Sequence, residues 1–315
     1  MAKSFKLRAL LRYYNNMVKY DLNKMTAQEF RKFADKENNS ILDGRAKKVG
    51  KITDLSVQGR NGVIPIRLYS PTQTKDAPVI VYFHGGGFVI GNLETHDKTC
   101  RRLCHDNNSF VVSVDYRLAP EHKFPAAPED CYDATKWASE NISQYGGNPD
   151  KLVVMGDSAG GNLATVTAIQ ARDLNGPKIA AQVLIYPTVD GHMKSPSIEE
   201  NGTGHILTAE LMNWFLNNYL NDEADKDHPL VSPILTNNLS NLPPALVQTA
   251  QFDPLRDEGI AFAQKLKAAG NQVQHTNYEG LIHTYFTMAG FSKKCGKTHE
   301  EVATFLKKKL ISSSI

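Results

Sequence analysis

Short apolar segments alternate with helical stretches along most of this chain, and that alternation limits the folds open to it. Some of these segments, such as 152–155 and 183–185, are nearly continuous apolar runs without polar alternation. Such runs are typical of parallel strands that are covered on both faces. The pattern predicts strands at 78–84, 110–116, 152–157, 181–186, 245–251 and 272–278. Helices are predicted at 3–20, 26–38, 95–107, 127–145, 159–173, 256–269 and 298–310.

Two regions depart from this alternation. Residues 47–70 read as two strands around Asn61-Gly62, a dipeptide typical of hairpin turns. Residues from about 188 to 242 are polar and loop-rich, with one helix predicted at 208–220. Long excursions of this kind are usually lids or binding loops. We therefore predict an α/β fold with a predominantly parallel sheet that begins with an antiparallel hairpin.

Composition and charge argue against several classes of protein. Lys and Arg number 36 and Asp and Glu number 33, so the formal charge of +3 is too small for electrostatic binding of nucleic acid. No apolar run reaches the 18 or so residues of a membrane span. The first ten residues lack the apolar region of a signal peptide, so we expect a cytoplasmic protein. A homodimer is left open.

Four cysteines are present, and their spacing matches neither a CxxC motif nor a zinc site. We expect them to be reduced, structural thiols: Cys100, Cys104, Cys131 and Cys295.

The segment Gly156-Asp157-Ser158-Ala159-Gly160 has the GxSxG pattern of a nucleophilic serine. It follows a predicted buried strand and opens a predicted helix, which is the strand–turn–helix context that the motif needs. In such a turn the strained backbone projects the serine hydroxyl above the sheet. Asp157 is interpreted as scaffolding. The alternative is a glycine-rich turn that binds phosphate at the start of the helix.

A second glycine-rich loop, His84-Gly85-Gly86-Gly87, ends the predicted strand at 78–84. Successive glycines allow bare N–H groups to turn toward one point, where they stabilise the oxyanion of an acyl-transfer reaction. The N–H of Ala159, directly after the serine, is the expected third donor. His84 precedes the serine, whereas the catalytic histidine of this kind of site comes last in the chain, so a structural role is expected.

The candidate base is His283, which lies just beyond the end of a predicted strand. Loops at the carboxyl ends of strands are where α/β sheets place their chemistry. His275 falls within a strand and His299 at the start of the last predicted helix, so both are less suitable. The candidate acid is Asp253, at the end of strand 245–251, in preference to Asp257 on the helix that follows.

These segments together resemble the hormone-sensitive-lipase-like family of esterases over roughly residues 60–310. The resemblance is carried by 84–88 (HGGGF), 115–121 (DYRLAPE), 124–127 (FPAA), 156–162 (GDSAGGN) and 253–258 (DPLRDE), with weaker matches at Tyr186-Pro187 and Ser232-Pro233. One departure is visible, because the family usually has Gly-Phe after the catalytic histidine and Thr284-Tyr285 stands here.

The resemblance implies an α/β-hydrolase fold with an eight-stranded, mostly parallel sheet and an α-helical cap. The catalytic core would be residues 46–187 and 243–315, and the cap would comprise helices within 1–45 and the insertion 188–242. The implied triad is Ser158, Asp253 and His283, and the implied oxyanion donors are Gly86, Gly87 and Ala159. The reaction would be hydrolysis of short- to medium-chain carboxylic esters, with no metal or organic cofactor.

Other functions remain open. A small-molecule receptor is one alternative, because the plant gibberellin receptors resemble this family but lack the catalytic histidine. All three triad positions are filled here, which favours an enzyme. Amidases, lactonases and thioesterases share the same tetrahedral intermediate and are not separated by the sequence. A lipase is less favoured, since the expected cap lacks a broad apolar stretch for docking at an interface.

Overall fold

The structure is a computed structural model that describes residues 3–37 and 42–311. Eight strands form one sheet in the order β1-β2-β4-β3-β5-β6-β7-β8. Only β2 runs against its neighbours, and the pairs from β4 to β8 are all parallel. The predicted α/β fold with a mostly parallel sheet is therefore confirmed. The strands are β1 (Lys51–Gly59), β2 (Gly62–Ser70), β3 (Ala77–Phe83), β4 (Phe110–Val114), β5 (Gly147–Asp157), β6 (Ala181–Ile185), β7 (Ala245–Phe252) and β8 (Val273–Ile282).

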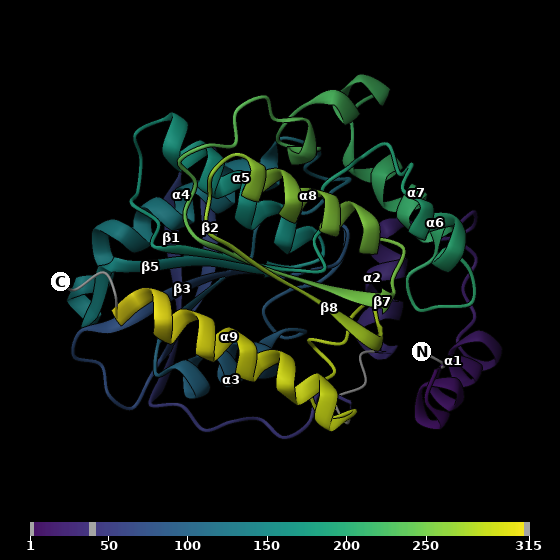
Figure 1. Ribbon diagram of the computed structural model, residues 1–315, viewed down its shortest axis with the longest axis horizontal. Helices are drawn as coiled ribbons and strands as arrows, with labels where there is room; N and C mark the ends of the chain where they lie inside the picture. Colours follow the sequence, from purple (N-terminus) through teal and green to yellow (C-terminus); the bar gives the residue numbers. More distant parts are fainter. Residues whose placement is uncertain (1–2, 38–41, 312–315) are drawn as a thin grey trace.

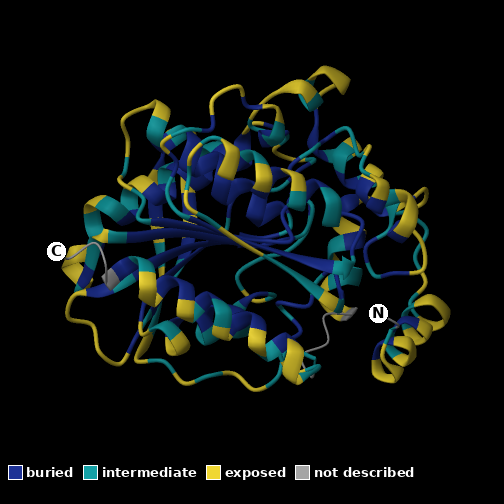
Figure 2. Ribbon diagram, in the orientation of Figure 1, coloured by how far each residue is buried: buried dark blue, intermediate teal, exposed yellow. Residues whose placement is uncertain are grey.

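Helices cover both faces of the sheet, as the continuous apolar strands require. On one face lie α3 (Asp97–Asn107) and α9 (Lys293–Ile311), and on the other lie α4 (Ala126–Asn141), α5 (Ala159–Asp173) and α8 (Arg256–Ala268), as Figure 1 shows. The central strands between these layers are almost completely buried (Figure 2). The central strands can therefore present functional side chains to solvent only near their ends.

Four further helices lie together beyond the carboxyl ends of the central strands (Figure 1). They are α1 (Phe5–Met17), α2 (Ala27–Glu37), α6 (Pro196–Asn201) and α7 (Ala209–Tyr219). Aromatic side chains connect the N-terminal helices to the helices that follow β6. The ring of Phe30 on α2 lies 5.0 Å from that of Trp214 on α7. None of the helices in the described part of the chain has the length and hydrophobicity needed to cross a bilayer.

The hairpin between β1 and β2 turns one residue earlier than the Asn-Gly dipeptide indicates. Gly59 pairs with Gly62, so the two loop residues are Arg60 and Asn61. Only Gly62 of this turn has a positive φ, at +136°. The glycine therefore supplies the unusual backbone angle from the first position of β2, while both loop residues keep ordinary angles.

Several element boundaries differ from the predicted ones. The last helix begins at Lys293 rather than 298, so His299 lies inside it. The last strand continues to Ile282, and the predicted helix 127–145 ends as a separate 3₁₀ turn over Ile142–Tyr145. The short helix α6 was not predicted, since its six residues are too few for a helical period to be recognised. Position 38 of the second predicted helix lies outside the described residues.

Candidate active site

Ser158 occupies a sharp turn between β5 and α5. Strand β5 ends at Asp157 and the helix begins at Ala159, so the serine alone connects them. Its backbone angles are φ 56° and ψ −118°, a conformation that is rare for a residue with a side chain. The N–H of Ser158 donates to the carbonyl of Ile185 on β6 at 2.9 Å, which holds the turn against the sheet. The predicted strand–turn–helix geometry is present.

Helix α5 begins so close to the sheet that one position has no room for a side chain. A Cβ atom on Gly160 would overlap the carbonyl oxygen of Phe83, the last residue of β3. The helix therefore packs directly on the ends of the central strands. This close approach determines where the hydroxyl of Ser158 lies.

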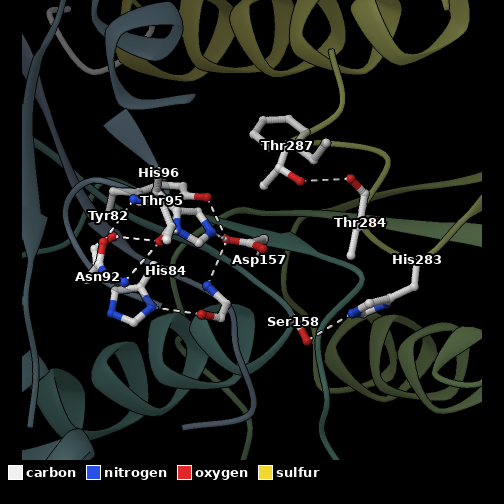
Figure 3. A network of polar contacts seen from close by, with 12 residues as sticks. Tyr82, His84, Asn92, Thr95, His96, Asp157, Ser158, His283, Thr284 and Thr287 are labelled. Carbon is white, nitrogen blue, oxygen red and sulfur yellow. Dashed lines mark hydrogen bonds and ion pairs between the residues drawn. The ribbon is translucent and has the colours of Figure 1, made fainter. Parts of the chain in front are cut away.

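The three predicted triad residues form one chain of hydrogen bonds. The hydroxyl oxygen of Ser158 lies 3.0 Å from Nε2 of His283, and Figure 3 shows the two side chains pointing toward each other. On the other side of the ring, Nδ1 lies 2.8 Å from Oδ2 of Asp253. Because Asp253 can only accept from Nδ1–H, Nε2 is left as an acceptor for the serine hydroxyl. Asp253 is fully buried and His283 is 5% exposed.

Strand register explains why Asp253 and His283 meet. Phe252 at the end of β7 pairs with Ile282 at the end of β8, after a register shift between residues 250 and 252. The residues that follow this pair are Asp253 and His283, so both leave the sheet at the same edge. A second hydrogen bond, from the N–H of Leu255 to Oδ1 of Asp253 at 2.8 Å, orients the carboxyl group.

The residues weighed as alternatives to the acid and the base lie outside this chain of hydrogen bonds. Asp257 accepts a hydrogen bond from Arg256 at 2.7 Å and lies in the first turn of α8. His275 contacts the hydroxyl of Thr249 within the sheet, and His299 is a buried residue of α9, whose Nε2 lies 2.9 Å from the carbonyl oxygen of Phe286.

His84 has contacts within its own loop. Its Nδ1 lies 2.7 Å from the carbonyl oxygen of Gly85, and its ring stacks on that of Tyr116. Burial lowers the pKa of His84 to about 3, so the ring is neutral. These contacts agree with the structural role expected for His84.

A buried polar network joins the two glycine-rich loops (Figure 3). Oδ1 of Asp157 accepts hydrogen bonds from the hydroxyl of Tyr82 at 2.6 Å and from the N–H of Gly85 at 3.0 Å. Nε2 of His96 lies 3.5 Å from the same oxygen. Burial alone would raise the pKa of Asp157, but His96 and Tyr82 bring it below its ordinary value. The charged carboxylate thus ties the HGGG loop to the serine turn.

A cavity of about 550 Å³ opens above these loops. Gly86, Gly87, Ser158 and His283 all line it, and Ala159 is buried directly after the serine. Gly87 has a φ of +59°, and a Cβ atom there would overlap the ring of Phe215 on α7. The loop therefore approaches the helices above it more closely than a residue with a side chain would allow.

Thr284 stands where the family usually has glycine, and its backbone adopts a conformation that suits glycine. Its φ is +72°, in the left-handed region that glycine adopts freely and β-branched residues rarely do. The strained turn is held by the hydroxyl of Thr287, which donates to the carbonyl of Thr284 at 3.0 Å. The backbone keeps the conformation that suits glycine although threonine stands there.

Two residues near the site were not singled out by the sequence analysis. Tyr186 places its ring 4.4 Å from that of His283 and so covers the imidazole. Glu258 is buried on α8 and accepts hydrogen bonds from the N–H groups of Val189 at 2.7 Å and Asp190 at 3.3 Å. Burial raises the pKa of Glu258 to about 8. The only sequence signal was their place in family motifs, since their partners lie far away along the chain.

Replacing Gly160 tests the close approach of α5 to the sheet. We expect Gly160→Ala to lower the free energy of unfolding by about 3 kcal/mol or more, because the methyl group must displace backbone atoms. Gly296 is a matched control inside α9, where an added Cβ atom meets nothing within 4 Å. Gly296→Ala should raise stability by up to about 1 kcal/mol. Urea unfolding measures both, and equal effects would contradict the steric argument.

Glu258 predicts a pH dependence of stability. The folded protein keeps the proton up to about pH 8, whereas the unfolded chain loses it near the ordinary glutamate pKa of 4.5. The folded state therefore binds the additional proton in this window, and stability falls as the pH rises through it. Glu258→Gln removes this loss. Its unfolding free energy should gain about 2 to 4 kcal/mol relative to wild type between about pH 5 and pH 8. A difference that stays constant with pH would contradict this account.

Comparison with known proteins places the chain in a family. A family model described as alpha/beta hydrolase fold matches residues 80–287. Esterase LipI of Mycobacterium tuberculosis is 44% identical over 245 residues, which cover 76% of each chain. The ethyl acetate hydrolase of Pseudomonas putida is 39% identical over 259 residues, 80% of this chain and 81% of that one.

Solved structures agree over the full length. A hyperthermophilic esterase from the archaeon Pyrobaculum calidifontis superposes with a TM-score of 0.93 at 42% identity, covering 98% of this chain and 99% of that one. The family membership of the chain follows from the sheet order, the HGGG loop, the serine turn and these relatives. The chain belongs to the hormone-sensitive-lipase-like family of carboxylic-ester hydrolases with the α/β-hydrolase fold.

Proposed function

We propose that the protein hydrolyses carboxylic esters through an acyl-enzyme intermediate on Ser158, with His283 as general base and Asp253 as the residue that orients the imidazole. The observation that carries this proposal is the continuous hydrogen-bond chain from Ser158 through His283 to Asp253. Nothing in that chain has to move before the serine hydroxyl can lose its proton to Nε2.

In the first half of the reaction, the serine oxygen attacks the ester carbonyl carbon while its proton passes to Nε2 of His283. Asp253 stabilises the imidazolium that forms, through the bond to Nδ1. The tetrahedral intermediate then collapses, the bond to the alcohol oxygen breaks, and His283 protonates the leaving alcohol. Water attacks the acyl-enzyme by the same route, with His283 again taking a proton, and releases the carboxylic acid.

The oxyanion of each tetrahedral intermediate would be held by the N–H groups of Gly86, Gly87 and Ala159. Gly86 and Gly87 line the same cavity as Ser158. Ala159 is the first residue of α5, so its N–H is one of those that a helix leaves without an internal partner. Each such donor typically contributes about 3 to 4 kcal/mol to lowering the barrier.

The cavity supports the proposed substrate class. Its walls above Ser158 are largely apolar and come from α2, α7 and the segment at the end of α1, including Val18, Phe33, Leu211 and Phe215. A volume of about 550 Å³ lies in the range of small-molecule sites and favours short- to medium-chain acyl groups. The similarity to an ethyl acetate hydrolase supports the short end of this range.

These cavity walls also support the proposed division into domains. Residues 1–45 and 188–242 would form the cap over a core of 46–187 and 243–315, since helices from both segments line the cavity. The cytoplasmic location stays a prediction from the sequence, and the homodimer stays open.

Substitution of Asp253 and of Asp257 tests which of the two carboxylates orients His283. Asp253→Asn should lower kcat by roughly a thousandfold to ten-thousandfold, because the amide no longer selects the productive imidazole tautomer. Asp257→Asn, the matched control on α8, should change kcat only slightly. Ser158→Ala should lose roughly a thousandfold or more. Hydrolysis of p-nitrophenyl butyrate measures all three, and Ser158→Ala with wild-type activity would overturn the proposal.

Labelling with an organophosphate provides an independent check on the nucleophile. We expect modification of Ser158 alone, and its loss in His283→Ala, because the hydroxyl then has no base. Mass spectrometry of the labelled peptide identifies the site. Labelling at another serine would contradict the assignment.

A series of p-nitrophenyl esters tests the acyl preference. Butyrate and hexanoate esters should have the highest kcat/KM, and the palmitate ester a much lower one, since a cavity of about 550 Å³ favours the shorter acyl chains. Values that rise steadily toward palmitate would instead indicate a lipase.

A further inference from the structure

Helix α1 has apolar side chains on two faces, although only one of them packs against the protein. Its inner face contributes Leu7 and Leu11, which are buried against Ile282 at the end of β8. A surface helix normally needs only this one apolar face. The second face therefore calls for an explanation.

The outer face presents a stripe of apolar side chains at four-residue spacing, Phe5, Ala9, Tyr13 and Met17. Residues four apart lie above one another on a helix, so the stripe is continuous. Phe5 is 79% exposed, Met17 68% and Tyr13 52%, which places them among the most exposed large hydrophobic side chains of the described residues. Figure 2 shows that the outward side of α1, at the edge of the molecule, is exposed along its length.

Positive charge accompanies the stripe. Residues 3–20 contain five cations and no aspartate or glutamate, in a chain whose acidic and basic residues are otherwise nearly balanced. Arg8 and Arg12 are exposed and flank the stripe on one side, four residues apart, and Lys6 is exposed on the other side. An apolar stripe with cations beside it is the pattern of a helix that lies in a membrane interface.

We propose that this outer face of α1, the α1 stripe, docks the protein reversibly on an anionic lipid surface. The apolar side chains would enter the headgroup region while Arg8 and Arg12 contact lipid phosphates. A second copy of the chain fits less well, because a two-fold contact along the stripe would bring the arginines of both copies together. Three large apolar residues and a few cations make binding weak and salt-dependent.

The position of α1 relates the stripe to the cavity. Tyr14 of the same helix and Val18, directly after its end, line the cavity, and Leu7 and Leu11 pack on Ile282, the residue before His283. Docking would therefore bring the cavity to a surface in which apolar esters collect. This use of docking depends on the proposed esterase function, but binding to lipid does not.

The α1 stripe also modifies an expectation from the sequence. The sequence shows no broad apolar stretch in the expected cap, because the residues of the stripe alternate along the chain with charged and buried residues. It becomes visible only once the buried face of α1 is known. Docking on a bilayer surface also differs from a lipase preference for long acyl chains, which the cavity volume does not favour.

Sedimentation with vesicles tests the docking directly. The Ser158→Ala protein should bind vesicles of phosphatidylglycerol and phosphatidylcholine, and should bind pure phosphatidylcholine vesicles far more weakly. Removing two cations with R8Q/R12Q should weaken binding roughly 20-fold. F5S/M17S should weaken it roughly 10-fold or more. None of these four residues lines the cavity, so each pair of changes, made in wild type, should leave hydrolysis of p-nitrophenyl acetate in solution unchanged.

Matched controls identify nonspecific effects. K297Q/K307Q removes the same charge from exposed positions on α9, and V63S/L174S removes two other exposed apolar side chains, 57% and 58% exposed. Both pairs should bind vesicles like the parent protein. The proposal fails if the parent does not bind anionic vesicles, or if the control pairs weaken binding as much as the α1 pairs. It also fails if F5S/M17S converts a dimer to a monomer in light scattering, which would assign the stripe to a second copy.

Discussion

Helix α5 packs against the ends of β3 and β5 with no side chain between them, and the rest of the site is arranged around this contact. Gly160 lies against the carbonyl oxygen of Phe83, where β3 ends and the HGGG loop begins. The same contact therefore positions two loops at once, the serine turn after β5 and the glycine loop after β3. Asp157 reinforces it through its bond to the N–H of Gly85. A single steric constraint thus aligns Ser158, the proposed nucleophile, with the groups proposed to hold the oxyanion.

The parts of the site that were predictable from the sequence are those controlled by local geometry and chain order. Asp253 and His283 each follow a strand of the structure directly, and the predicted strand ends together with chain order were sufficient to select them as candidates. The contacts of Glu258 with Val189 and of Tyr186 with His283 were not predictable, because they join segments about 70 to 100 residues apart and have no pattern of their own. The start of α9 was also not predicted, because residues 293–297 are mainly polar and show little helical periodicity.

Burial affects the ionisable groups around the site in opposite ways, according to their partners. Glu258 has only backbone N–H groups on one oxygen, and no partner for the other among the described residues, so burial keeps it protonated. Asp157 is equally enclosed, but Tyr82 and His96 stabilise its charged form. Neutral His84, stacked on Tyr116, adds no competing charge. Asp157 thus carries a stable negative charge at the point where the HGGG loop and the serine turn meet.

The chain order of the site has a consequence for synthesis on the ribosome. Ser158 and His283 are separated by 125 positions, and the strands that carry Asp253 and His283 are the last two of the sheet. A growing chain therefore completes the serine turn long before the histidine that would activate it has been made. Under the proposed mechanism, the serine has no base until β8 pairs with β7, so the nascent protein cannot yet hydrolyse an ester. Activity would then require the last strand of the sheet to be in place.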